Sequence, residues 1–208
     1  ELRLNLFSPE IGVNDRGDLG FAKGIVSGVQ LETVLRELSR IKGYTEFDKL
    51  PIPFRAVETD LVTGKPKIFD RGDLALAMRA SMSVPGIIAP AEFDDMMLVD
   101  GGLVNNLPVD VARALGADIV IAVNLGTPLS KREDIKNVLG ITGQMIGILT
   151  EQNVQQTLAT LKSTDILILP ELGNYSAGDF DNMKSTFPIG EPAARKVADR
   201  LAALSLPA

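Results

Sequence analysis

Residues 96–102, Met-Met-Leu-Val-Asp-Gly-Gly, have the pattern of a short apolar strand that ends in a carboxylate, Asp100, and two glycines. In α/β enzymes, the ends of strands are where catalytic groups are presented. Gly101 and Gly102 let a ligand or another loop approach the backbone closely, because they have no side chain. The stretch therefore predicts that Asp100 is half of a catalytic pair. Asp before Gly is also a common turn sequence, so a purely structural role for Asp100 stays open at this point.

The composition limits the chemistry that the chain can perform. The 208 residues include no cysteine and no histidine, which excludes disulfides, a Ser-His-Asp triad, a Cys-His pair and zinc sites with histidine ligands. The net charge of −6 gives no broad basic surface, so no nucleic-acid partner is expected. No run of about 18 apolar residues occurs, so no transmembrane segment is predicted. The N-terminus shows no signal-peptide pattern.

Helical and strand patterns alternate along the chain, which is typical of an α/β domain. Helices are predicted at residues 28–42, 73–80, 108–115, 132–161 and 188–204. Strands are predicted at residues 51–61, 66–69, 96–100, 118–124 and 165–170. The first 24 residues are expected to be irregular or hairpin-like, with a turn at residues 14–18.

These elements predict a single α/β domain over residues 1–208, with a mostly parallel sheet flanked by helices. The strand at 118–124 is expected to be buried on both faces, and the stretch from residue 96 to residue 124 to form a right-handed βαβ unit. In the helix at 132–161, a stripe of apolar residues that includes Val138, Met145 and Leu149 is expected to be buried.

Several motifs around Asp100 occur together. They are Arg-Ala-Ser-Met-Ser-Val-Pro-Gly at 79–86, Ala-Pro at 89–90, Val-Asp-Gly-Gly-Leu-Val-Asn-Asn-Leu-Pro at 99–108 and Leu-Gly-Ala-Asp at 115–118. Their order and spacing resemble the patatin-like phospholipases, a family of lipid acyl hydrolases, from about Ile25 to Thr127. The resemblance implies a patatin-like three-layer architecture and acyl transfer without a metal or cofactor. In that family the Asp of the D-G-G or D-G-A element is the catalytic acid of a Ser-Asp dyad, and Asp100 matches its position.

The sequence departs from the family pattern in two motifs. The family's nucleophile lies in a G-x-S-x-G turn and its oxyanion hole in a G-G-G-x-R/K-G loop, and neither motif occurs in this chain. The nearest serine, Ser27 in Gly-Ile-Val-Ser-Gly at 24–28, has the wrong spacing and is interpreted as a helix cap. We therefore expect the chain to be the C-terminal portion of a catalytic domain, incomplete at its N-terminal side. The first residue, Glu1, also favours a fragment or a processed product.

Three further residues near Asp100 have structural explanations. Ser81 and Ser83 follow a predicted helix, and hydroxyls at that position commonly bond to backbone groups, so they are interpreted as structural and not as nucleophiles. Arg79 could meet a phosphate, but the helix dipole explains a cation at a helix C-terminus.

The loop residues around Asp100 are assigned in the same way. Asn105 and Asn106 are expected to shape the loop after the glycines, and both are also candidates for fixing Asp100. Asp94 and Asp95 are interpreted as a hairpin turn and not as metal ligands, so no metal site is predicted.

Two functions follow. The first is a lipid acyl hydrolase that cleaves ester bonds of phospholipids or related acyl lipids at the periphery of a membrane or in the cytoplasm. Asp100 would be its base, Gly101, Gly102 and Asn105 would shape the site, and the 208 residues alone would be inactive. The second is an inert module that binds a lipid or a protein. A missing nucleophile strand would expose a sheet edge, so we also expect a homodimer or a recruited segment.

Overall fold

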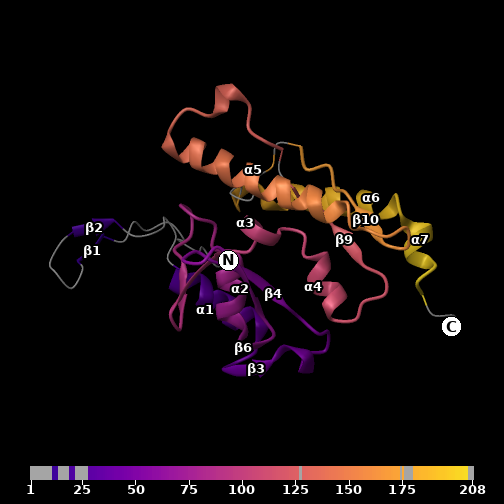
Figure 1. The fold of residues 1–208 in the computed structure, drawn as a ribbon, viewed down its shortest axis with the longest axis horizontal. Helices are drawn as coiled ribbons and strands as arrows, with labels where there is room; N and C mark the ends of the chain where they lie inside the picture. The colour runs from indigo at the N-terminus through magenta and orange to yellow at the C-terminus, as the bar shows by residue number, and fades with distance from the viewer. Residues whose placement is uncertain are drawn as a thin grey trace. The chain divides into compact units, whose positions relative to one another are not determined.

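The computed structural model describes residues 11–13, 19–21, 28–126, 128–173, 175 and 180–205, and Figure 1 shows their helices and strands along the chain. The chain divides into two compact units, residues 1–104 and residues 105–208, which are described separately here. Both units contain helices and strands, so the predicted mixed α/β class is confirmed. A single domain over residues 1–208 remains a prediction.

The first unit carries most of the strands. Its elements are β1 (Ile11–Val13), β2 (Leu19–Phe21), α1 (Gly28–Ser39), β3 (Tyr44–Glu46), η1 (Phe47–Lys49), β4 (Ala56–Asp60), β5 (Lys65–Phe69), β6 (Arg71–Asp73), α2 (Leu74–Ser81), β7 (Ala91–Phe93) and β8 (Met96–Asp100), followed by α3 (Gly102–Asn105). β1 pairs with β2 and β3 with β6, both antiparallel. The hairpin expected in the first 24 residues is thus confirmed, while its turn at 14–18 and the predicted helix cap Ser27 lie outside the described residues.

The strand that carries Asp100 belongs to a four-stranded sheet with the order β5-β4-β8-β7. Every neighbouring pair in this sheet is antiparallel, so the predicted mostly parallel sheet is not found here. Two of these pairs, β4 with β5 and β7 with β8, are hairpins, which are antiparallel by construction, and the third joins β4 to the distant strand β8. Gly64 and Asp94 lie in their turns at φ 68° and φ 50°, and the second position agrees with the hairpin turn predicted at Asp94 and Asp95. Pro66 lies in the edge strand β5, where a missing N–H is tolerated.

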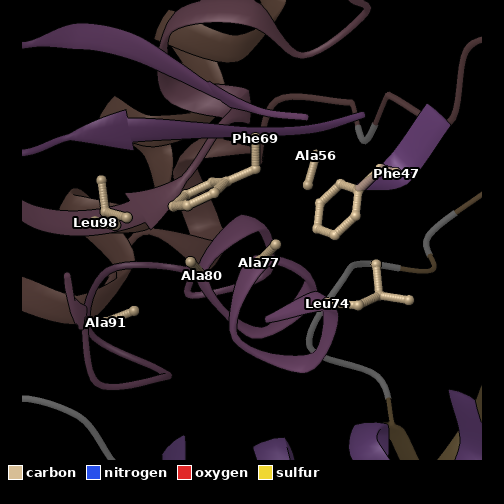
Figure 2. Packing of buried hydrophobic residues seen from close by; sticks show 8 residues of the cluster. All are labelled: Phe47, Ala56, Phe69, Leu74, Ala77, Ala80, Ala91 and Leu98. Atoms are coloured by element: carbon tan, nitrogen blue, oxygen red, sulfur yellow. The ribbon is translucent and has the colours of Figure 1, made fainter. Parts of the chain in front are cut away.

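Helix α2 packs against β4 and β8 and begins where the sequence predicts. The Asp73 carboxylate caps it by accepting hydrogen bonds from the N–H groups of Ala75 and Leu76 at 3.0 and 3.2 Å. The core between helix and sheet consists of Phe47, Ala56, Phe69, Leu74, Ala77, Ala80, Ala91 and Leu98. In Figure 2, Phe69 and Ala56 extend from the sheet toward α2, where Ala77 and Ala80 present only methyl groups. These small side chains allow the helix to lie close to the strands.

The second unit consists of α4 (Val109–Ala114), β9 (Ile121–Val123), η2 (Arg132–Asp134), α5 (Val138–Leu158), β10 (Ile166–Ile168), η3 (Phe180–Thr186), α6 (Phe187–Arg195) and α7 (Ala198–Ala202). β9 pairs with β10 in parallel, and α5 lies between them in the chain. The parallel strand–helix–strand connection therefore runs from β9 to β10. The predicted unit from residue 96 to residue 124 is not formed as expected, because β8 pairs with β4 and β7.

Three sequence expectations in the second unit need correction. β9 is not buried on both faces, because the side chains of Ile121 and Val123 are exposed and only Ala122 is buried. In α5, Val138, Met145 and Leu149 are exposed, so the predicted buried stripe is wrong for them. α5 also starts later than predicted.

The predicted terminal helix is divided into α6 and α7 at residues 196–197. The N–H of Val197 bonds to the carbonyl of Ala194, three residues back, which tightens and ends α6.

Gly101 is in close contact with the backbone of β4. A Cβ placed on Gly101 would lie 2.1 Å from the carbonyl oxygen of Val57, whereas a Cβ on Gly143 in α5 would have nothing within 4 Å. Gly101 is therefore needed where β8 ends, because a backbone oxygen inside the sheet cannot move away as a flexible side chain could.

We predict that Gly101→Ala destabilises the 208-residue chain by about 1–3 kcal/mol, the usual cost of overpacking. The matched variant Gly143→Ala should be neutral or stabilising, because alanine is the better helix former. Urea unfolding followed by far-UV circular dichroism measures both. Equal stability of the two variants would contradict the close contact between Gly101 and Val57.

Candidate active site

Asp100 is the last residue of β8 and is fixed by contacts from three directions. Its N–H donates to the carbonyl of Ser83 at 3.0 Å, and its carbonyl accepts from the Thr59 hydroxyl at 2.9 Å. Its carboxylate Oδ1 accepts from the N–H of Gly102 at 2.7 Å. Burial raises the pKa of the Asp100 carboxyl, and the Gly102 N–H acts in the opposite direction. The result is a half-buried carboxylate with raised basicity and a restricted orientation.

The serines near Asp100 make backbone contacts. The hydroxyl of Ser81 donates to the carbonyl of Val57 at 2.8 Å, and the hydroxyl of Ser83 donates to the carbonyl of Arg79 at 2.8 Å. Ser83 is completely buried. These contacts agree with the structural interpretation of both hydroxyls.

Arg79 is buried in the α2 layer rather than placed to receive a ligand. Its Nη2 donates to the carbonyls of Ala89 and Pro90 at 3.0 and 3.1 Å. The guanidinium also lies against Gly28, where a Cβ would come within 1.8 Å of Nη2. Arg79 thus connects α2 to the segment before β7, and these contacts give no support to phosphate binding.

The two asparagines after the glycines make contacts within the second unit. Nδ2 of Asn105 donates to the Asp110 carboxylate at 2.8 Å, and the N–H of Asn106 donates to Oδ1 of Asn153 at 2.9 Å. Asn105 therefore interacts with the first turn of α4. The suggested role of both asparagines in fixing Asp100 stays a prediction, as do the site-shaping roles of Gly101 and Gly102.

In the described part of the chain, no cluster of three or more histidine, cysteine or acidic side chains is arranged to hold a metal ion. None of the helices there has the length and apolar character needed to cross a membrane.

The sequence analysis missed Glu58, in the middle of β4. Its side chain is completely buried, and neither carboxyl oxygen has a hydrogen-bond partner among the described residues. Burial raises the pKa of Glu58 to about 8, while Lys67 on the neighbouring strand lowers it. The strand register places Glu58 directly opposite Asp100. Because side chains alternate along a strand, the sequence could have indicated that Glu58 shares a face with Ala56. It could not have indicated which residue of a neighbouring strand lies opposite Glu58.

We predict that Glu58 makes the chain less stable as the pH rises. In the unfolded chain Glu58 ionises near its ordinary pKa of 4.5, and in the folded chain near 8. Between these values the folded state binds a proton that the unfolded state has released, so the free energy of unfolding falls as the pH rises. The loss is on the order of 3–5 kcal/mol. Glu58→Gln should remove this part of the pH dependence.

Urea unfolding at about pH 5 and about pH 9 measures this loss for the wild type, Glu58→Gln and the control Asp95→Asn. Asp95 is an exposed acid in the turn before β8, so Asp95→Asn also replaces one acid by its amide but removes no buried carboxyl. The control should keep the wild-type slope of stability against pH. The same slope in Glu58→Gln would contradict the buried, neutral carboxyl.

The chain is similar to uncharacterised NTE family proteins of mycobacteria. It is 43% identical over 97 residues to one from Mycobacterium tuberculosis, covering 47% of this chain and 27% of that protein. It is 45% identical over 83 residues to another, from Mycobacterium bovis, and this match covers 40% of this chain and 14% of that protein. It is also 38% identical over 92 residues to patatin-like phospholipase domain-containing protein 7 of Mus musculus, covering 43% of this chain and 7% of that protein. The chain thus spans about a quarter of the length of the first of these relatives and less of the others.

A family model described as Patatin-like phospholipase matches residues 4–113, which is more than half of the chain. The match begins earlier than the resemblance noted from the motifs, which started near Ile25, and it includes Asp100 and both glycines after it. The chain therefore belongs to the patatin-like phospholipase family.

Proposed function

We propose that this chain supplies the general base of a Ser-Asp lipid acyl hydrolase that cleaves carboxylic ester bonds of phospholipids or related acyl lipids. The observation that supports this most is the environment of Asp100: a half-buried carboxylate at the end of β8, inside the family match, with one oxygen bonded to the N–H of Gly102. The nucleophilic serine and the oxyanion hole would lie outside these 208 residues, because neither motif occurs among them.

In this mechanism the serine oxygen attacks the carbonyl carbon of the ester, and Asp100 takes the hydroxyl proton. Backbone N–H groups of the oxyanion hole stabilise the negative oxygen that forms. When this intermediate collapses, the ester C–O bond breaks and the leaving alcohol receives the proton from Asp100. Water then attacks the acyl-serine, Asp100 takes a proton from the water and returns it to the serine, and the fatty acid is released.

The environment of Asp100 suits this role. A solvated Asp, with a pKa of about 3.9, is a weak base toward a hydroxyl at neutral pH. Burial raises the pKa of Asp100 and thus its basicity. A positioned general base contributes about 10²–10⁴-fold to the rate, and one oxyanion-hole donor about 10²–10³-fold.

The proposal extends to the assembly around this unit. Residues 1–208 would be the C-terminal portion of one catalytic domain, and the nucleophile-bearing segment would complete a three-layer architecture with a larger, mostly parallel sheet. A phospholipid substrate would bring the protein to the periphery of a membrane. Until the sheet is completed, its free edge would favour a homodimer.

The second candidate is a catalytically inert module that binds a lipid or a protein. The absence of a G-x-S-x-G motif from the 208 residues favours it for the isolated chain. The two candidates differ in whether Asp100 is needed for turnover in the full-length protein.

In the full-length protein, Asp100→Asn should lower ester hydrolysis by at least about 10²-fold, because an amide cannot accept the serine proton. The fold should persist, since the amide oxygen still accepts from the N–H of Gly102. Release of fatty acid from phospholipid vesicles measures turnover, and circular dichroism measures folding. Asp95→Asn, which removes an exposed acid from the same hairpin, should keep wild-type activity. Wild-type turnover by Asp100→Asn would remove Asp100 from the mechanism.

The 208-residue chain by itself should not react with a fluorophosphonate probe, because its serines near Asp100 are bonded to backbone carbonyls. Gel fluorescence after incubation with the probe measures labelling, with the full-length protein as the positive control. Covalent labelling of any serine in the isolated chain would overturn the assignment of the nucleophile to another segment.

A further inference from the structure

We propose that Glu58 is a positioning residue for Asp100, and that its protonated carboxyl donates a hydrogen bond to the Asp100 carboxylate in the reacting enzyme. This inference rests on the function proposed above, because it concerns the same base. Its evidence is the strand register, the complete burial of Glu58 and the lack of any hydrogen-bond partner for its carboxyl oxygens among the described residues.

The register places the two residues opposite each other on neighbouring strands. In the pairing of β4 with β8, Glu58 lies opposite Asp100. The N–H of Asp100 points away from β4 and donates to Ser83, so this is a pair without mutual backbone hydrogen bonds. In such pairs the side chains are closest, with Cβ atoms about 4.5–5.5 Å apart. A glutamate side chain is long enough to reach its neighbour's carboxylate across that distance.

The other charged groups near Glu58 are engaged elsewhere or face away. Lys67 of β5 lies opposite Glu58 on its other side, but its ammonium lies over the Phe69 ring, 5.3 Å from the ring centroid. Arg79, the charged residue of α2, donates to backbone carbonyls. In β7, Ala91 lies opposite Leu98, which shares the face of Asp100. Because side chains alternate along a strand, the adjacent Glu92 points to the other face of the sheet.

Asp60, two residues further along β4, shares the face of Glu58. Its carboxylate accepts from the N–H of Val62 and the hydroxyl of Thr63 at 3.1 and 2.6 Å. Among the described acids of β4 and β8 on this face, the Asp100 carboxylate on the opposite strand is therefore the acceptor that we assign to a donor on Glu58.

This geometry determines what Glu58 does at each protonation state. A carboxyl that is buried without a partner stays neutral, and a neutral carboxyl has one O–H to donate. Bonded to Asp100, it would fix the carboxylate and leave an oxygen for the serine hydroxyl. When Glu58 ionises, this donor is lost and a second negative charge faces Asp100. Hydrolysis should therefore decline at alkaline pH.

The test uses the full-length protein and 4-nitrophenyl butanoate, with kcat and KM measured between about pH 6 and about pH 10. The variants are Glu58→Leu, which has no donor, Glu58→Gln, which keeps a donor that cannot ionise, and Asp100→Asn. The control is Asp95→Asn, an exposed acid on β8's hairpin. Circular dichroism confirms folding for each.

Glu58→Leu should lower kcat about 10- to 100-fold with little change in KM, the range expected for losing one hydrogen bond to a charged group. Glu58→Gln should recover part of that loss, and it should lack the alkaline decline that the wild type shows near pH 8. Circular dichroism at each pH separates this decline from the loss of stability predicted above, because a role in packing alone would lower kcat only where the folded fraction falls. Should Glu58→Leu fail to fold, the pH profile of Glu58→Gln decides.

Wild-type kcat in Glu58→Leu, or the wild-type alkaline decline in Glu58→Gln, would overturn the inference. If either occurs while Asp100→Asn is inactive, the inference fails and the proposed function stands. If Asp100→Asn keeps full turnover, the proposed function fails and this inference fails with it.

Discussion

The pairing of β4 with β8 is the constraint on which the candidate site depends. The N–H of Leu61 donates to the carbonyl of Met97 at 2.8 Å, and the hydroxyl of Thr59 donates to the carbonyl of Asp100. These bonds hold the two strands together at both ends of the pairing. Beyond the last pair, Gly101 fits against the carbonyl of Val57 because it has no Cβ. A shift of one residue in this register would move Asp100 to the other face of the sheet. The sheet therefore sets the face on which Asp100 lies, and the N–H of Gly102 fixes its carboxylate.

Neighbouring carboxyls on β4 show why burial alone does not fix the pKa of an acid. Glu58 and Asp60 lie on the same face and are both buried. The pKa of Asp60 is lowered, mainly by the hydroxyl of Thr63, whereas that of Glu58 is raised because desolvation is not offset by any hydrogen bond. Asp100 lies between these cases, with one backbone donor working against desolvation. Hydrogen-bond donors thus give three buried or half-buried acids on one face of the sheet pKa values that are shifted in different directions or by different causes.

Local signals in the sequence were sufficient for much of the fold. The cap at Asp73, the turn at Gly64 and the strand ending at Asp100 each depend on residues within a few positions of one another. The family motifs located Asp100. The pairing of β4 with β8 joins residues about forty positions apart, and no local pattern specifies it. For this reason the antiparallel sheet and the position of Glu58 opposite Asp100 were not foreseen.

The same distinction explains the errors in the second unit. Helical periodicity shows that Val138, Met145 and Leu149 follow a common stripe, but it does not show whether another element covers that stripe. In the structure Val154, nearer the end of α5, is buried in a cluster with Val120 and Ala122, at and next to β9. In the first unit, the ammonium of Lys67 likewise lies over the Phe69 ring, a contact that sequence spacing does not predict.

Under the proposed function, the base and the nucleophile lie in separate segments of the protein, and the contacts of Asp100 bear on how these segments would combine. The hydrogen bonds described for Asp100 join it to Thr59, Ser83 and Gly102, which all lie in the first unit. Under the proposed function, an incoming serine would meet a base whose orientation had already been fixed during folding. Preorganisation of this kind lowers the cost of reaching the reactive geometry, since little reordering is left for the chemical step. The sheet therefore contributes to the proposed reaction through the register that places Asp100, and the segment that carries the serine needs only to bind against a finished half of the site.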